Sequence, residues 1–257
     1  VLYGGTSTVR LTFPELGECI PYKLSMSNIS SSDDGGQTLC EDATPADVVT
    51  SATRVSGSLE GMESTWNTDG SPYCLMDDVN IRSNHMLTIG EGTRILVNPF
   101  PEDGGLGTSG GVDILVFGGL EINGTESSPV TVVSGATSPA AGDWGSFIFY
   151  HNSWNTNTVA NAEVSHANIA VKVNDSQLEI TGGEFSHCMY GCVSVDGEIV
   201  SISGAGFSDC TEGNTSLYSV RIDNADDSTI FNNTSKNASN GLSLFSKVYV
   251  TANTFKD

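Results

Sequence analysis

The sequence predicts an all-β fold in which the chain winds as a single-stranded parallel β-helix, or solenoid. Short segments alternate apolar with polar residues, as in Leu87-Thr88-Ile89 and Leu178-Glu179-Ile180. Alternation of this period is typical of a strand with one buried face. Glycine, asparagine and serine separate the segments, and no segment of useful length has the period of a helix. Related segments also return at a spacing of a little over 20 residues, which is the signature of a repeat architecture.

The repeat is clearest in the second half of the chain. The motif at residues 163–166 (Glu-Val-Ser-His) is echoed 21 residues later at 184–187 (Glu-Phe-Ser-His) and 22 residues further on at 206–209 (Gly-Phe-Ser-Asp). If each repeat is one coil, equivalent residues lie about 4.8 Å apart, the distance between neighbouring strands. We therefore expect Phe185 to stack on Phe207. The next coil leaves the phenylalanine position open between Phe231 and Ser235.

Two other all-β architectures fit the spacing poorly. An antiparallel sandwich has hairpin turns about every 8–12 residues, and a β-propeller has a blade period of about 40–50 residues. Neither period matches the steps of 21 and 22 residues.

The chain divides into two parts on this pattern. Residues 55–257 carry the repeat and are predicted to form the β-helix, with a loop leaving its wall at 98–113. Residues 1–54 do not join the repeat and are expected to form an N-terminal extension or small β module. Within it Val9, Leu11 and Phe13 alternate as one strand, and Tyr22 and Leu24 belong to another.

The charge balance excludes several partners. Asp and Glu number 31 against 10 Lys and Arg, which gives a formal net charge of −21. Such a chain repels nucleic acids and anionic membranes. No apolar run approaches the roughly 20 residues of a transmembrane helix. We expect no cofactor, although the acidic residues make loose Ca²⁺ binding an expectation without a defined loop to hold the ion.

The cysteines and glycosylation motifs indicate an extracellular or cell-surface protein. Six cysteines, an even number, favour disulfides and an oxidising compartment. Cys188 and Cys210 share one frame of the repeat and are the preferred bridge, with Cys19 and Cys40 as the second candidate pair, although six cysteines allow 15 connectivities. N-glycosylation motifs of the form Asn-x-Ser/Thr, or sequons, begin at seven asparagines: Asn28, Asn123, Asn174, Asn214, Asn232, Asn233 and Asn237.

Several phrases resemble a known family. They are residues 65–73 (TWNTDGSPY), 87–93 (LTIGEGT), 120–130 (LEINGTESSPV) and 142–145 (GDWG). In this order and spacing they are similar to secreted right-handed parallel β-helix proteins of the pectin-lyase-like superfamily. The resemblance implies a right-handed helix over about residues 55–257. It leaves the activity open, because this superfamily includes polysaccharide lyases, hydrolases, adhesins and non-catalytic surface proteins.

The most suggestive polar cluster is His166, His187 and Asp209, with Glu163 and Glu184 beside it. In the β-helix register these residues form two columns on adjacent coils, where they could hold a metal or transfer a proton. The alternative is a column of turn residues facing water, which we favour. Asp69, Asp77 and Asp78 resemble the acidic residues of polygalacturonases, but their separation is too short for one coil and no Gly-His-Gly follows. We therefore assign no catalytic residue.

The function predicted from these observations is that of a secreted structural or adhesive surface glycoprotein, more readily non-enzymatic than enzymatic. The sequence stops within the repeat without a visible cap, so we expect head-to-tail association into a filament, with Val9, Leu11 and Phe13 as the assembly strand. The alternatives are a polysaccharide lyase or glycoside hydrolase, and a carbohydrate-binding β-helix that uses Trp144, Tyr150 and Trp154.

Overall fold

The computed structural model describes residues 52–99, 111–151, 157–210, 218–237 and 241–256, together with the backbone of four short strands nearer the N-terminus. Those four strands form two antiparallel pairs: β1 (Tyr22–Leu24) with β4 (Ala46–Val48), and β2 (Ile29–Ser30) with β3 (Thr38–Cys40). Val9, Leu11 and Phe13 lie outside the described residues. The first strand of the stack is β5 (Thr53–Ser58), close to the predicted start of the helix at residue 55.

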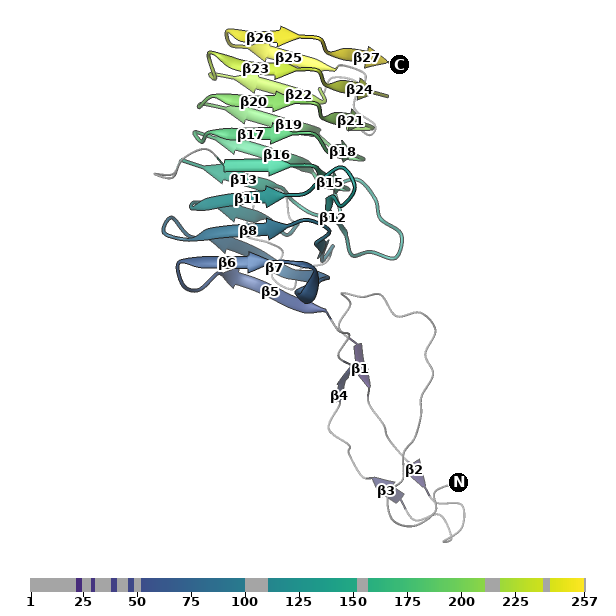
Figure 1. Cartoon of the computed structure of the whole chain (residues 1–257). Helices are drawn as coiled ribbons and strands as arrows, with labels where there is room; N and C mark the ends of the chain where they lie inside the picture. Colours follow the sequence, from purple (N-terminus) through teal and green to yellow (C-terminus); the bar gives the residue numbers. More distant parts are fainter. Residues whose placement is uncertain are drawn as a thin grey trace.

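From β5 onward the chain is a parallel β-helix, as predicted, whose coils rise in sequence order (Figure 1). Its strands fall into three faces. Face 1 contains β7 (Tyr73–Ile81), β10 (Ile114–Val116), β13 (Phe147–Tyr150), β16 (Ile169–Asn174), β19 (Gly191–Asp196), β22 (Val220–Asp223) and β25 (Leu242–Phe245). Face 2 contains β6 (Glu63–Trp66), β8 (Met86–Gly90), β11 (Gly119–Asn123), β14 (Asn157–Ala160), β17 (Leu178–Thr181), β20 (Val200–Ser203), β23 (Ser228–Phe231) and β26 (Val248–Thr251).

Face 3 contains β9 (Arg94–Val97), β12 (Val130–Ser134), β15 (Ala162–Ser165), β18 (Glu184–Ser186), β21 (Gly206–Ser208), β24 (Thr234–Lys236) and β27 (Thr254–Lys256). The long strand β7 joins two faces, because its start pairs with β9 and its end with β10. A single 3-10 turn, η1 (Thr68–Gly70), is the one helical element among the described residues.

The register confirms the predicted repeat. Phe185 pairs with Phe207 on the next coil, and their stacked rings lie 5.7 Å apart between centroids. Ser235 takes the following position and Phe255 the one after that, whereas Phe231 lies at the end of β23 and is 51% exposed. The open alternative is thus resolved in favour of Ser235.

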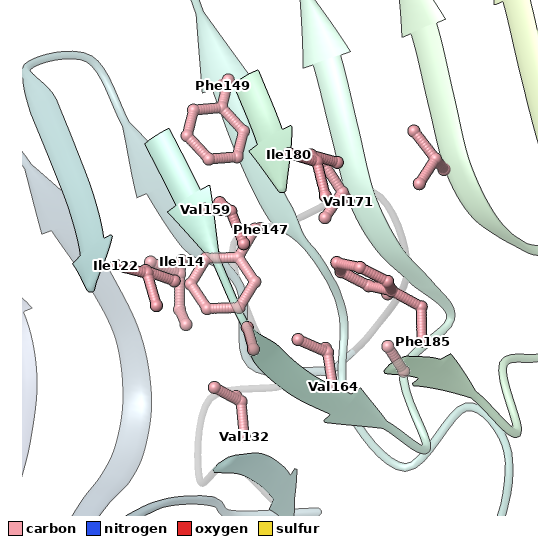
Figure 2. Close-up of a cluster of buried hydrophobic side chains, with 14 of the residues drawn as sticks. Ile114, Ile122, Val132, Phe147, Phe149, Val159, Val164, Val171, Ile180 and Phe185 are labelled. Atoms are coloured by element: carbon pink, nitrogen blue, oxygen red, sulfur yellow. The ribbon is translucent and has the colours of Figure 1, made fainter. Parts of the chain in front are cut away.

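Inward-facing residues of the three faces form one continuous core. On face 1 the column includes Ile114, Phe147 and Val171, and Figure 2 shows them beside Val132 and Val164 from face 3. All five side chains are at most 2% exposed. Burying an aliphatic or aromatic side chain of this kind stabilises a fold by about 1.5–3 kcal/mol. Stacked columns therefore supply the stability that no single coil could have.

The corners explain why asparagine, aspartate and glycine punctuate the sequence. Left-handed backbone with positive φ recurs at three corner columns: Asn161, Gly182, Gly204, Asn232 and Ala252 between faces 2 and 3; His166, His187, Asp209 and Asn237 between faces 3 and 1; and Asp175, Gly197 and Asn224 between faces 1 and 2. Glycine has no Cβ to clash in this conformation, and asparagine and aspartate tolerate it better than most residues. The sequence punctuation thus marks where each coil bends.

The disulfide differs from the prediction. Cys210 is bonded to Cys192, with a Cα–Cα distance of 5.3 Å, so the expected bridge between Cys188 and Cys210 is wrong. Cys188 and Cys210 do occupy equivalent buried places, since each sulfur lies 3.3–3.5 Å from the carbonyl oxygen two residues earlier. Cys192, at the start of β19, brings its sulfur to the Phe185 carbonyl that Cys210 also contacts. Cys74 is also disulfide-bonded, and the side chains of Cys19 and Cys40 lie outside the described residues.

Candidate functional site

The histidine column forms as the repeat predicts. His166 and His187 stack with ring centroids 5.4 Å apart and planes inclined by 17°. Both have left-handed backbone, as does Asp209 on the next coil. The column sits at the corner between faces 3 and 1, where His187 is exposed and the other two are half-buried.

The neighbouring glutamates also align on face 3. Glu163 pairs with Glu184, and the following position is Gly206, whose missing side chain leaves room for the Glu184 carboxylate. The Ser208 hydroxyl donates to this carboxylate at 2.7 Å. Glu184 is thereby held against the wall of the helix rather than directed into a cleft.

This arrangement gives no support to a metal site. Within the described ranges, no three His, Cys, Asp or Glu side chains are placed to hold one ion. The two imidazoles are stacked nearly face to face, whereas ligands of one metal direct their nitrogens toward a common point. His166, His187 and Asp209 thus lie in one column of polar corner residues.

A pair of buried carboxylates on face 1 was not singled out from the sequence as a pair. Asp78 and Asp113 each precede the inward residue of their strand, Val79 and Ile114, which pair across neighbouring coils. One Asp78 oxygen accepts the backbone N–H of Asp113 at 2.8 Å, and Asp113 Oδ1 accepts the N–H of Ser146 at 2.7 Å. Each carboxylate therefore ties its coil to the next. An aspartate immediately before each of two apolar residues that pair across neighbouring coils is the signal that would have found them.

The environment of Asp113 favours its protonated form. The residue is fully buried, and this desolvation, with the nearby Asp78 charge, raises the pKa of Asp113 to about 6; the hydrogen bond from Ser146 and the Lys172 charge oppose the shift. Its Oδ2 atom is buried without a hydrogen-bond partner. Residue 145 must be glycine, because a Cβ there would collide with the Asp113 carboxylate.

A cavity of about 450 Å³ opens on face 1 at Ser146, whose backbone N–H donates to Asp113. It is lined by Gly142, Ser146, Asn168, Ile169, Lys172, Met189 and Tyr190. The set combines an aromatic ring that is 52% exposed (Tyr190), a carboxamide, a hydroxyl and an ammonium group. No carboxylate is among the described residues that line it.

The aromatic residues first considered for carbohydrate contact are mostly engaged elsewhere. Trp144 is fully buried, and its indole N–H donates to the Ser165 carbonyl at 2.8 Å. Tyr150 stacks on Phe117 with centroids 4.5 Å apart. Trp154 lies outside the described residues. Tyr190, which the sequence did not single out, is the aromatic ring that lines the cavity.

Comparison with known families agrees with this architecture. Residues 57–177 match the family described as a pectate-lyase-like β-helix domain. Over these residues the chain is similar to a β-helix domain of the pectate-lyase-like type. The strands after residue 177 continue the same three faces in register, up to β27. The resemblance to the pectin-lyase-like superfamily is thus confirmed, and this domain type supports a carbohydrate-related or surface protein.

Two further comparisons found no similar protein. Neither the curated proteins nor the solved structures include a match to this chain. In the part of the chain that the structure describes, no helix has the length and apolar character needed to cross a membrane.

Proposed function

We propose that this chain is an adhesive surface protein whose β-helix binds glycans in the face 1 cavity without cleaving them. The cavity itself is the observation that carries the proposal. An exposed tyrosine ring can stack on the apolar face of a sugar. The Asn168 carboxamide, the Ser146 hydroxyl and the Lys172 ammonium group supply polar partners, as ligand sites combine apolar walls with a few placed polar groups.

Binding without turnover is favoured by the chemistry of the lining. Hydrolysis of a glycosidic bond by the usual route needs two carboxyl groups at a defined separation across the substrate. The buried carboxylates nearest the cavity, Asp78 and Asp113, already accept backbone N–H groups. These hydrogen bonds hold neighbouring coils together. We therefore assign glycan binding, without cleavage, to the cavity.

The test is binding of the intact chain to immobilised neutral and acidic oligosaccharides, followed by chromatography of the unbound sugar. We expect Tyr190→Ala to weaken binding at least tenfold. Phe231→Ala is the matched control, because Phe231 is 51% exposed at the end of β23 on face 2, away from the cavity. Equal binding by both variants would refute the site, and release of shortened sugar would identify an enzyme instead.

Head-to-tail self-association is a separate part of the proposal. Phe245, Tyr249 and Phe255 expose apolar surface in β25, β26 and β27, which supports a protein contact there. Sedimentation velocity over a hundredfold range of concentration measures this association. A sedimentation coefficient that does not change over that range would contradict it.

A further inference from the structure

Two sequons overlap at residues 232–235, and the structure gives their asparagines opposite environments. Asn232 is exposed at the corner between faces 2 and 3, whereas Asn233 is only 5% exposed. The hydroxyl residues differ in the same way. Thr234, which completes the first sequon, is half-buried, and Ser235, which completes the second, is buried against the Ser219 hydroxyl at 3.1 Å.

The Asn233 carboxamide is fully used inside the helix. Its Oδ1 accepts the Ala205 backbone N–H at 2.8 Å. Its Nδ2 donates to the Ile202 carbonyl at 2.9 Å and to Asn253 Oδ1 at 3.0 Å. The side chain thus links three consecutive coils. A sugar on Nδ2 would remove one of these hydrogen bonds and place a bulky polar group in the packed interior.

Asn123 is the second exposed asparagine on the same edge of the helix. It is the last residue of β11, and strand pairing carries its position through Ala160, Thr181 and Ser203 to Phe231, the residue before Asn232. Four steps of strand spacing separate the two levels by about 19 Å. Figure 1 shows β11, β17, β20 and β23 stacked along one side of the helix.

We propose that Asn123 and Asn232 carry N-linked glycans along the edge between faces 2 and 3, and that Asn233 stays unmodified in the folded protein. In the transfer the asparagine Nδ2 bonds to C1 of the oligosaccharide, the bond from C1 to the phosphate oxygen of a lipid-pyrophosphate donor breaks, and Nδ2 loses one proton. The inference rests on the proposed surface location, since this donor is met on the secretory route.

The experiment is site mapping of the chain secreted by a eukaryotic host. Enzymatic release of the glycans in ¹⁸O water converts each occupied asparagine to labelled aspartate, which peptide mass spectrometry locates. We expect label at Asn123 and Asn232 and none at Asn233. Label at Asn233 in the folded fraction, or its absence from Asn123 or Asn232, would overturn the inference.

The overlapping sequons provide a matched pair of variants. Thr234→Ala removes only the sequon of Asn232, and Ser235→Ala removes only that of Asn233. We expect the first variant to lose one glycan in gel mobility and the second to keep both. Thermal melting monitored by circular dichroism reports whether each variant is folded. If either variant does not fold, the site mapping of the wild-type chain alone tests which asparagines are modified.

The two proposals fail separately. Loss of oligosaccharide binding in the cavity would refute the proposed function and leave the mapped glycans unchanged. An unglycosylated secreted chain that still binds oligosaccharides would refute only this inference.

Discussion

Asp78 lies directly beneath Asp113 on neighbouring coils of face 1, and its carboxylate accepts the Asp113 backbone N–H at 2.8 Å. The hydrogen bond ties two coils together, yet it also brings two carboxylates close together in a buried place. Burial first, and then the nearby Asp78 charge, favours the protonated form of Asp113 and raises its pKa from 3.8 to about 6. The hydrogen bond fixes how the two coils align, but burying the Asp113 charge lowers the stability of the fold at neutral pH.

The first prediction is a pH dependence of stability. Because the folded-state pKa of Asp113 is raised, its contribution is fully present below pH 3.8 and is lost as the pH rises through about 6. The free energy of unfolding should fall by about 3 kcal/mol across this window on account of this group. Lys172 partly offsets the effect, and Asp78 reinforces it.

Urea titrations at pH 4 to 8 measure this contribution. In Asp113→Asn the amide oxygen can still accept the Ser146 N–H, but the side chain no longer titrates, so the contribution should disappear. Glu126→Gln, at an exposed loop position, removes one carboxylate as a control and should keep the wild-type slope. An unchanged slope in Asp113→Asn would show that another group controls it.

The second prediction concerns the disulfide. The bond between Cys192 and Cys210 spans 18 residues, and a loop of this length stabilises a fold by about 3 kcal/mol through the unfolded chain. Cys210→Ala should lower the unfolding free energy by about that amount. Cys188→Ala removes a sulfur from the equivalent buried place on the preceding coil, and should cost about 1 kcal/mol for lost packing.

Guanidinium unfolding of both variants distinguishes the two costs. Reducing agent should destabilise the wild type by more than Cys210→Ala, because the variant has only the bond of Cys74 left to lose among the described disulfides. A similar loss in both variants without reductant would assign the effect to packing alone.

The sequence predicted the fold because each coil contributes equivalent side chains to the core, so the core residues recur along the chain at the length of one coil. The step from Phe185 to Phe207 is the step of one coil, and alternation identifies which side chains face inward. It could not predict the cavity, because Tyr190, Lys172 and Gly142 come from different coils and have no periodic relation. The disulfide was mispredicted for a related reason. The repeat spacing shows that Cys188 and Cys210 occupy equivalent positions on neighbouring coils. The bond depends instead on the start of β19, which brings the Cys192 sulfur to the Phe185 carbonyl beside Cys210.

The third prediction tests the stacked aromatic column. Phe185 and Phe207 are buried, and replacing either by alanine should cost about 3–5 kcal/mol, with a coupling between them of about 1 kcal/mol in a double-mutant cycle. Phe255 occupies the same column but is 55% exposed. Phe255→Ala should therefore cost less than about 1 kcal/mol. Comparable losses at Phe207 and Phe255 would contradict the burial gradient along the column.

The fourth prediction reverses the usual effect of glycine. Ala252 has left-handed backbone, with φ of 56°, at the corner column where Gly182 and Gly204 stand on earlier coils. A Cβ in this conformation costs about 1 kcal/mol, so Ala252→Gly should raise the unfolding free energy by about that amount. Ala160→Gly is the control, because Ala160 lies within strand β14, where glycine should destabilise by about 0.5–1 kcal/mol. Opposite signs in chemical denaturation support the corner geometry, and destabilisation by both substitutions would show that the corner at residue 252 does not require left-handed backbone.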